Sequence, residues 1–319
     1  MNEITVIIPN FNGIQYLPCL MESLSRQTEK NFSVLIVDNG STDESLDYLR
    51  RNWPKAEILP LEKNYGFSYA VNAGIQACKT PLVVLLNNDI EAEEGFVEAL
   101  AAAVRRHPGA FSCQAKMIAF YDRDRLDGAG DLYCALGWAY ARGKGKPAHT
   151  YEKEETVFAC CAGAAIYRRD RLTELGLFDD AHFAYLEDVD LGYRARLKGY
   201  ENWYVPSAAV YHVGSGTSGT RHNAFKTRYS SRNNVYLIYK NMPLPQILLN
   251  IPFLLPGFLI KGLYFILKGL GKEYFGGLKE GIALSAKNRG SKAKGAGFRV
   301  YASIQTELWG NMLRLLFSR

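Results

Sequence analysis

Short apolar runs alternate with segments of helical periodicity over the first hundred residues. Continuous apolar runs of strand length predict strands at Ile4–Ile8, Ser33–Val37, Ala56–Leu59 and Leu82–Leu86. Apolar residues at three- and four-residue spacing predict helices at Ile14–Leu24, Asp43–Arg51, Phe67–Cys78 and Glu98–Arg106. Strands that are apolar on both faces and alternate with helices indicate a mostly parallel sheet flanked by helices. The fold class is therefore predicted to be α/β.

The pattern changes after this first part of the chain. Asp122–Pro147 is rich in Gly, Asp and basic residues, which predicts a long and partly mobile loop. Regular structure is predicted again in an apolar segment at Phe158–Tyr167, in helices at Asp170–Leu175 and Leu186–Leu197, and in closing strands at Trp203–Val205 and Ala208–Val213.

Polar residues follow the four predicted strands of the first part. Asn10, Asp38, Asn64 and Asp89 come at or just after the strand ends. Ligands of open parallel α/β sheets bind beyond the carboxyl ends of the strands. Asn and Asp also form turns, so each one alone could be a turn residue. The set of four favours a ligand site.

Composition excludes several classes of protein. The chain has 319 residues, of which 48% are apolar and 22% charged, so it is not disordered, collagen-like or a disulfide scaffold. Its six cysteines form no CxxC pair and no zinc-finger spacing. The first ten residues lack the basic and apolar regions of a signal peptide. We therefore expect a cytoplasmic protein with reduced thiols.

The charge is divided unevenly along the chain. Residues 221–319 hold 16 Lys and Arg against 3 Asp and Glu, a net charge of +13, whereas the first 220 residues carry −7. Such asymmetry suggests that the basic part meets an anionic surface. Apolar residues interleave with its lysines, which fits lipid better than nucleic acid, so no nucleic-acid partner is expected.

The basic region also contains a long uncharged stretch. Asn241–Ile260 has no charged residue but has four prolines, which favours re-entrant or surface-lying helices over a spanning helix. Lys261, Lys268, Lys272 and Lys279 would share one face of a helix, with apolar residues opposite. This pattern is typical of a helix in a membrane interface. The alternative is a helix that packs on the rest of the protein and exposes its lysines.

These features predict an α/β domain at residues 1–240 and a basic, helical, membrane-interfacial region at 241–319. The predicted location is cytoplasmic and peripheral, on the inner face of the membrane. An anionic membrane surface is then a partner of this region.

Three groups of residues could carry chemistry. Asp89 ends the run Asn87-Asn88-Asp89, where it could cap a helix or bind a hard cation. Glu187, Asp188 and Asp190 begin a predicted helix, on which 187 and 190 share a face and 188 points elsewhere. His212 precedes the string GSGTSG at 214–219, which has no βαβ context for a dinucleotide site. A mobile loop beside a candidate ligand histidine is the preferred interpretation of this string. The alternative is a structural histidine, which is the more common role of a lone histidine.

Eight ordered strings resemble family 2 glycosyltransferases, and most closely their bacterial rhamnosyltransferase-like branch. They are VIIPNFN (6–12), VDNGSTD (37–43), NYGFSYAVNAGI (64–75), LLNNDI (85–90), CAGAAIYRR (161–169), GLFDD (176–180), YLEDVDLGYRARLKGY (185–200) and YHVGSGT (211–217). The resemblance covers roughly residues 3 to 240. It implies a GT-A (Rossmann-like) fold and inverting sugar transfer from a nucleotide-diphosphate sugar.

The resemblance also implies roles for individual residues. The nucleotide sugar would be bound by Pro9, Asn10, Asp38, Asn39, Gly66, Asn72, Asn88 and Asp89. Asp89 and His212 would hold a divalent cation, Mn²⁺ or Mg²⁺, and Asp188 would be the catalytic base. Gly163, Glu187 and Arg232 would lie near the acceptor or the diphosphate. The chain departs from the family pattern at Asn87 and Asn39, where many relatives have Asp.

The implied donor is a dTDP- or UDP-sugar that carries rhamnose or another hexose. The implied acceptor is a lipid-linked or cell-surface glycan. Two alternatives remain: a processive polysaccharide synthase, and a pseudoenzyme or scaffold that binds nucleotide sugars.

Overall fold

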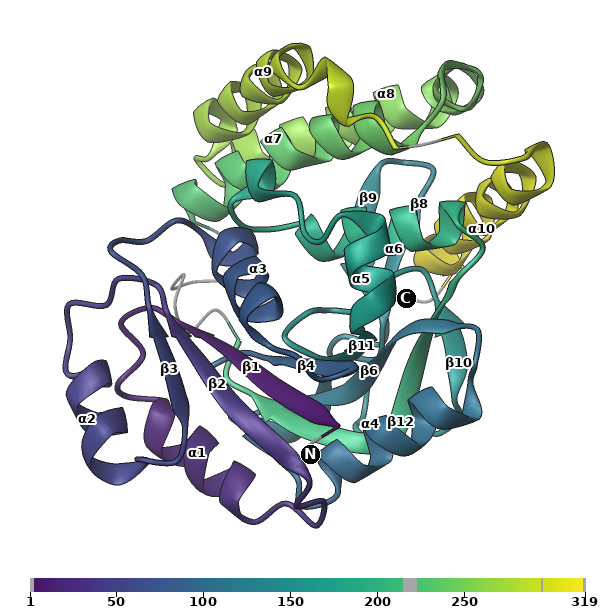
Figure 1. Cartoon of the computed structure of the whole chain (residues 1–319). Coiled ribbons are helices and arrows are strands. Elements are labelled where there is room, and N and C mark those ends of the chain that lie inside the picture. The colour runs from purple at the N-terminus through teal and green to yellow at the C-terminus, as the bar shows by residue number, and fades with distance from the viewer. Residues whose placement is uncertain (1–2, 215–222, 294, 318–319) are drawn as a thin grey trace.

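The computed structural model describes residues 3–214, 223–293 and 295–317. Within these residues, ten strands form one mixed sheet whose main path runs β10-β12-β6-β11-β4-β1-β2-β3, while β5 pairs with β12 and β7 with β6. Figure 1 shows the sheet at the centre, with helices above and below it and the C-terminal helices at the top. Most of the predicted 214–219 string lies outside the described residues.

The predicted first four strands are confirmed and pair in parallel. They are β1 (Ile4–Asn10), β2 (Phe32–Asp38), β3 (Glu57–Pro60) and β4 (Leu82–Leu86). The register of β1 and β2 places Asn10 opposite Asp38. The intervening helices are α1 (Leu17–Ser25), α2 (Ser45–Asn52) and α3 (Phe67–Ala77). The carboxyl ends of these strands therefore meet at one edge, as the sequence predicts.

Two hydrophobic clusters cover the two faces of the sheet. On one face, buried residues of α1, α2 and α4 (Phe96–Arg106) pack against the strands. On the other face lie α3, α5 (Arg169–Leu175), α6 (Glu187–Leu197) and the C-terminal helix α10 (Phe298–Phe317). This layered arrangement confirms the predicted α/β class with helices on both sides.

The loop predicted at 122–147 is wrong, because this segment contains three strands. They are β7 (Asp122–Gly128), β8 (Asp131–Cys134) and β9 (Trp138–Ala141). β7 pairs with β6 (Ala110–Ala119) and exposes its charged first half, so it lacks the apolar run of a buried strand. Gly130 has φ +100°, and a Cβ there would lie 2.4 Å from Val157. Glycine is therefore required between β7 and β8.

The sheet contains further differences from the prediction. The closing strands are one strand, β12 (Glu201–His212), with an irregularity between Val205 and Ala209. Two short strands, β5 (Ile90–Ala92) and β10 (Glu155–Val157), were not predicted, because three residues carry too little pattern. β11 (Ala164–Arg168) runs antiparallel to β4 and β6. A short helix, η1 (Asp180–His182), precedes α6.

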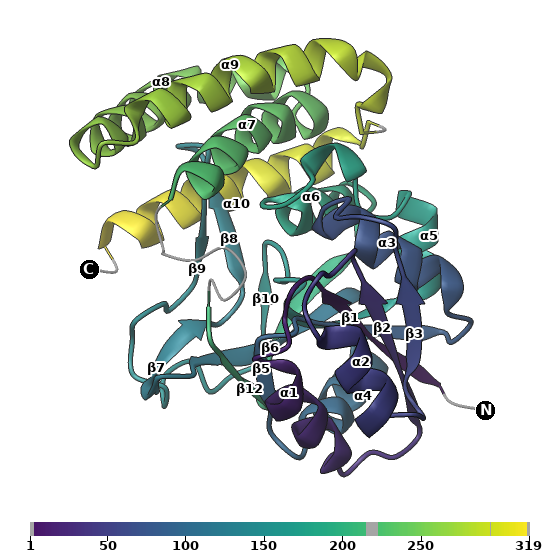
Figure 2. The ribbon, with the colours of Figure 1, turned by 90° about the vertical axis from the view of Figure 1, so that its left-hand side faces the viewer.

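The C-terminal helices lie above the sheet (Figure 2). They are α7 (Ala224–Asn241), α8 (Leu244–Leu267), α9 (Gly271–Lys287), the short η2 (Arg289–Ser291) and α10. A single helix through Lys261–Lys279 is wrong, because α8 ends before Gly269, whose φ is +72°. The four lysines therefore do not share one helix face. The division into 1–240 and 241–319 stays a prediction, since Leu254, Ile304 and Leu308 join the hydrophobic cluster of the catalytic part.

Candidate functional site

The ends of β1, β2 and β4 bring three candidate nucleotide-binding residues together. Asn10 donates from Nδ2 to Oδ1 of Asp38 at 3.0 Å, and Asn88 donates to Oδ1 of Asn10 at 2.8 Å. Pro9 pairs with Val37 in the adjoining register. All three polar side chains are buried, so their mutual hydrogen bonds fix their orientation.

Asn39 and Gly66 organise the turn that enters α3. The Asn39 amide donates to Oδ1 of Asn64 at 3.0 Å and to the Gly66 carbonyl at 3.2 Å, while its Oδ1 accepts from the Tyr65 N–H at 3.0 Å. Gly66 has φ +93°, and a Cβ there would lie 2.5 Å from the Phe183 ring. The contacts of Asn39 are thus made inside the protein, where they hold this turn against the Phe183 segment.

Asn72 and Arg232 hold the segment that leads into α6. Asn72 exchanges hydrogen bonds with the backbone of Phe178, at 2.8 and 3.0 Å. Arg232 donates to the carbonyls of Ala181 and His182, at 2.9 and 2.7 Å. Both predicted site residues therefore make positioning contacts within the protein, and a contact with donor or acceptor stays a prediction for each.

Asp89 and His212 lie side by side, and a third residue orients the histidine. His212 Nε2 is 3.4 Å from Oδ1 of Asp89, and its Nδ1 is 2.8 Å from Oδ2 of Asp127. The Val213 N–H donates to the Asp89 carbonyl at 3.0 Å, which ties the end of β12 to the turn after β4. In metal-ligating histidines one ring nitrogen binds the metal and the other is held by a carboxylate, so Asp127 on Nδ1 leaves Nε2, beside Asp89, as the candidate ligand atom. This donor set fits a divalent cation.

Electrostatics at this cluster favours a charged histidine when no cation is bound. Burial acts against the charge, but hydrogen bonds with Asp127 and Asp89 outweigh it and raise the pKa of His212 to about 9. Burial also opposes ionisation of Asp127, yet His212 and the ion-paired Lys144 hold the pKa of that carboxyl below its usual range. Asp127 was missed at the sequence level because its strand was predicted as a loop.

The three acidic residues at the start of α6 have different surroundings. Asp190 is fully buried and forms ion pairs with Arg194 and Lys240, both at 2.9 Å, so it is structural. Glu187 is buried too, and its Oε2 has no hydrogen-bond partner among the described residues. Burial, with Asp188 nearby, raises the pKa of Glu187 well above its usual range. Asp188 is partly exposed, unlike Glu187 and Asp190.

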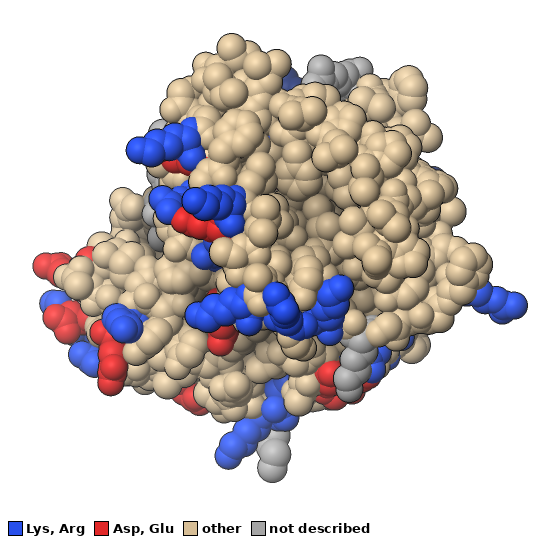
Figure 3. Space-filling view, turned by 90° about the horizontal axis from the view of Figure 1, so that it is seen from above, with Lys and Arg blue, Asp and Glu red and all other residues tan. Residues whose placement is uncertain are grey.

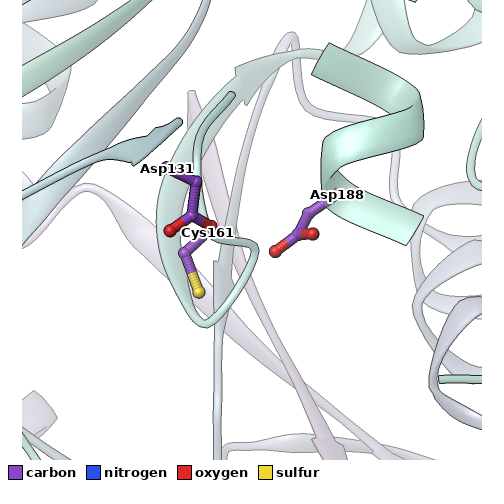
Figure 4. A group of neighbouring side chains, drawn as sticks. All are labelled: Asp131, Cys161 and Asp188. Atoms are coloured by element: carbon purple, nitrogen blue, oxygen red, sulfur yellow. The ribbon is translucent and has the colours of Figure 1, made fainter. Parts of the chain in front are cut away.

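Asp188 faces Asp131 and Cys161 (Figure 4). The ligand atoms of these three side chains lie within 4.8 Å of one another, and each residue is partly exposed. Burial of the Asp188 carboxyl outweighs hydrogen bonds from the Ala162 N–H and the Cys161 thiol, and raises the pKa of Asp188 to about 6. Asp131, like Asp127, was not singled out from the sequence.

Gly163 lies between the turn at Cys161 and the end of β4. Its carbonyl accepts from the Asn87 N–H at 2.9 Å, and a Cβ at this position would lie 2.9 Å from Asn87 Nδ2. A glycine therefore allows the backbone at position 163 to lie close against Asn87.

Sequence comparison finds related glycosyltransferases. The N-acetylglucosaminyl-diphospho-decaprenol L-rhamnosyltransferase of Mycobacterium tuberculosis is 29% identical over 237 residues, which cover 67% of this chain and 77% of that protein. The uncharacterized glycosyltransferase YwdF of Bacillus subtilis is 28% identical over 216 residues, which cover 66% of this chain and 74% of that protein.

Solved structures share the fold at low sequence identity. A crystal structure of GalNAc-T7 with UDP, GalNAc and Mn²⁺ has a TM-score of 0.62 at 16% identity, covering 75% of this chain and 48% of that one. A structure of Staphylococcus aureus TarS 1–349 with UDP-GlcNAc has a TM-score of 0.59 at 19% identity, covering 98% and 85%. These likenesses confirm the predicted GT-A fold.

The family description "Glycosyl transferase family 2" matches residues 5–176, more than half of the chain. This match spans β1 to α5 and includes Asn10, Asp38 and Asp89. Together with the mycobacterial relative, it confirms the resemblance drawn from the sequence. The protein belongs to glycosyl transferase family 2, in its rhamnosyltransferase-like branch, and is a glycosyltransferase.

Proposed function

We propose that the protein transfers rhamnose or another hexose, with inversion, from a nucleotide-diphosphate sugar to a lipid-linked or cell-surface glycan acceptor. The observation that carries this proposal is the placement of two acidic groups at one sheet edge. Asp89 with His212 and Asp127 forms one group, and Asp188 forms the other. Such a pair of groups suits a reaction in which a leaving diphosphate and an incoming hydroxyl both need assistance.

The donor side is assigned to the ends of β1, β2 and β4. Asn10, Asp38 and Asn88 form a buried, preorganised polar cluster there, next to Pro9 and Asn39. A UDP- or dTDP-sugar fits this assignment, because the related structures hold UDP or UDP-GlcNAc and the mycobacterial relative is named as a rhamnosyltransferase. The relatives also support a place in cell-envelope polysaccharide synthesis.

Asp89 and His212 would hold a divalent cation, with Asp127 orienting the imidazole. When bound, the cation supplies a Lewis acid that offsets the negative charge of the departing diphosphate. Mixed carboxylate and imidazole ligation favours Mn²⁺ over Mg²⁺. Asn87 contributes no charge here, so the chain offers fewer anionic ligands than relatives with Asp at this position.

Asp188 is the proposed general base. Its carboxylate accepts the proton of the acceptor hydroxyl while the hydroxyl oxygen bonds to the anomeric carbon and the bond to the diphosphate breaks. Attack from the side opposite the leaving group inverts the configuration at this carbon. The partial exposure of Asp188 leaves it accessible to an acceptor, whereas Asp190 forms ion pairs with Arg194 and Lys240.

A direct test uses a panel of UDP- and dTDP-sugars with Mn²⁺ and a lipid-linked N-acetylglucosamine acceptor. We expect one donor to give a glycoside whose anomeric configuration, measured by NMR, is opposite to that of the donor. A product that retains the configuration would contradict the role of Asp188. Donor binding without any turnover, to acceptor or to water, would support the scaffold alternative instead.

The proposed location is the inner face of the membrane, where α8 would lie in the interface. Among the described residues, α8 is the one helix long and apolar enough to cross a membrane, yet Gln246, Asn250 and Gly257 of one face are buried against the protein. Trp138 Nε1 donates to the Gly257 carbonyl at 3.0 Å, which fixes this packing. A helix held in this way lies on the protein and does not need to span the bilayer.

The other face of α8 is apolar and exposed. Half or more of each side chain is exposed at Leu244, Leu248, Leu249, Leu255, Leu259, Ile260, Leu263, Ile266 and Leu267. Seen from above, the described surface carries its charged side chains mostly at the left and across the lower part of the view, and leaves a broad area without them in the upper part (Figure 3). An exposed apolar patch of this kind marks an interaction surface. The net charge of +13 after residue 220 makes an anionic bilayer the proposed partner.

A further inference from the structure

The connection between β7 and β8 carries a carboxyl group at each end. Asp127 at one end is paired with His212, whereas Asp131 at the other end lies beside Asp188. Residues 127–131 therefore link the proposed cation side of the site to the proposed base. The proposed function uses Asp127 to orient His212, but it gives no task to Asp131.

The backbone holds Asp131 in a fixed direction. Its N–H donates to the Ala159 carbonyl and its carbonyl accepts from the Ala159 N–H, both at 3.0 Å. Gly130 directly before it has a conformation that suits glycine, and its carbonyl accepts from the Arg142 N–H at 2.8 Å. The side chain points toward Asp188 and Cys161 (Figure 4). This anchoring indicates that the approach of the two carboxyl groups is a built feature.

The surroundings of the pair are poor in compensating charge. Most of the titratable groups near Asp131 and Asp188 are acids, and one is basic. The acids are Glu187 of α6, Cys161, Tyr167 of β11 and Asp127 of β7, and the basic group is Lys144. Lys144 is already paired with Asp127. Burial, and then the Asp188 charge, raise the pKa of Asp131 well above its usual range. Two carboxyl groups this close do not both ionise readily, which favours a state in which one of them stays protonated.

We propose that Asp131 is a positioning residue for the base Asp188, which it keeps oriented and ionised by carrying the single proton of the pair. The proton of the acceptor hydroxyl then goes to the Asp188 carboxylate, while Asp131 keeps its own proton. When Asp131 loses that proton at higher pH, a second negative charge faces the Asp188 carboxylate. Turnover therefore falls on the alkaline side. This inference rests on the proposed role of Asp188.

The test compares pH profiles of kcat for full-length wild type, Asp131→Asn and Asp131→Ala at saturating donor and Mn²⁺. Asparagine keeps the shape and a donor group but cannot ionise. We expect Asp131→Asn to keep kcat within about threefold at pH 7 and to lose the alkaline fall of the wild type. Asp131→Ala loses about 10- to 100-fold in kcat across the range, because the base is misplaced, with the donor KM unchanged. The exposed carboxyl Asp124 on β7 gives the control Asp124→Asn, which behaves as wild type.

Several results would overturn the inference. One is an alkaline fall in Asp131→Asn that superposes on the wild-type profile. Another is a drop in bound Mn²⁺ by one ion per chain in Asp131→Asn, which would make Asp131, Cys161 and Asp188 a metal site. Donor binding, measured by calorimetry, shows whether each variant is folded. If Asp188→Asn retains full activity, the proposed function itself fails. If Asp188→Asn is inactive but Asp131→Asn keeps the alkaline fall of the wild type, only this inference fails.

Discussion

Proteins usually bury apolar side chains and expose charged ones, and two regions of this molecule differ from that pattern in opposite ways. The site at the sheet edge buries charged groups, and the helix α8 exposes apolar ones. At the sheet edge, carboxyl groups are buried or half-buried and close to one another, as at Asp89, Asp127 and Asp188. On α8, leucine and isoleucine side chains are exposed along the helix, as at Leu255 and Leu259. A buried charge and an exposed apolar row each cost free energy unless a partner is present.

The difference indicates what each region binds. The sheet edge offers anionic oxygens and an imidazole, which suit a cation and a proton. The α8 face offers apolar surface beside a basic region, which suits a bilayer with anionic headgroups. We propose chemistry for one region and placement at the membrane for the other, so variants in each should separate the two functions.

The largest effect is expected when the carboxylate at the end of the β4 turn is removed. Asp89→Ala should lower the transfer rate by about 10³-fold, because the leaving diphosphate loses its main electrostatic stabilisation. The measurement is the initial rate of product formation over a range of Mn²⁺ concentrations. Glu94→Gln, an exposed acid that follows β5, is the matched control and should keep the wild-type rate. Mn²⁺-independent turnover of Asp89→Ala at the wild-type rate would break this half of the comparison.

The membrane half is tested by changing three exposed leucines of α8. Leu255→Ser, Leu259→Ser and Leu263→Ser together should weaken binding to anionic vesicles by about 10²-fold, since each leucine contributes part of its transfer free energy. Co-sedimentation with phosphatidylglycerol vesicles measures this effect, and transfer to a soluble acceptor should be unchanged. Tyr121→Ser, at an exposed aromatic residue outside α8, is the control. If vesicle binding is unchanged, and light scattering shows a dimer for the wild type and a monomer for the variant, the exposed face of α8 serves self-association instead.

A smaller effect is expected at the partner of the candidate ligand histidine. Asp127→Asn removes the carboxylate that orients His212, and we expect Mn²⁺ affinity to fall by about 10- to 100-fold. The rate at saturating Mn²⁺ should recover most of the wild-type value. The Mn²⁺ concentration for half-maximal activity is the quantity to compare, and an unchanged value would remove Asp127 from the cation side.

The smallest effect concerns mild acid. Because burial raises the pKa of Asp188 to about 6, the base is ionised above this pH and protonated below it. The kcat of wild type should therefore fall by about tenfold per pH unit below 6 while it changes little between pH 6.5 and 7.5. A profile of kcat at saturating donor checks this. An acid fall centred near pH 4 would mean that the residue titrates as an ordinary exposed carboxyl.

Much of the site was predictable because strand ends carry a clear signal. Asn10, Asp38 and Asp89 follow apolar runs that are buried on both faces, so the pattern locates both the strand and its end. The roles of Asp188 and His212 were predicted from the family resemblance. The sequence pattern alone showed that Asp188 lies at the acidic start of a helix and that His212 lies at the end of a strand. The parallel half of the sheet follows from the same signals.

The missed parts have physical reasons as well. Asp127 and Asp131 lie on β7 and β8, and the charged, exposed start of β7 has the composition of a loop. Its strand exists because β6 supplies the hydrogen bonds, which no local pattern records. The sequence also did not indicate which face of α8 is exposed. The buried face is set by contacts such as that of Trp138 with Gly257, two residues that lie 119 positions apart.

The most direct test of the account separates donor binding from transfer in Asp188→Asn. The account predicts that this variant binds the nucleotide sugar and Mn²⁺ with wild-type affinity in calorimetry, because Asp188 lies on the acceptor side. Its transfer rate should fall by about 10²- to 10⁴-fold, which is the usual rate enhancement contributed by a general base. Loss of donor binding in parallel with transfer, in a variant that melts like wild type, would contradict the account.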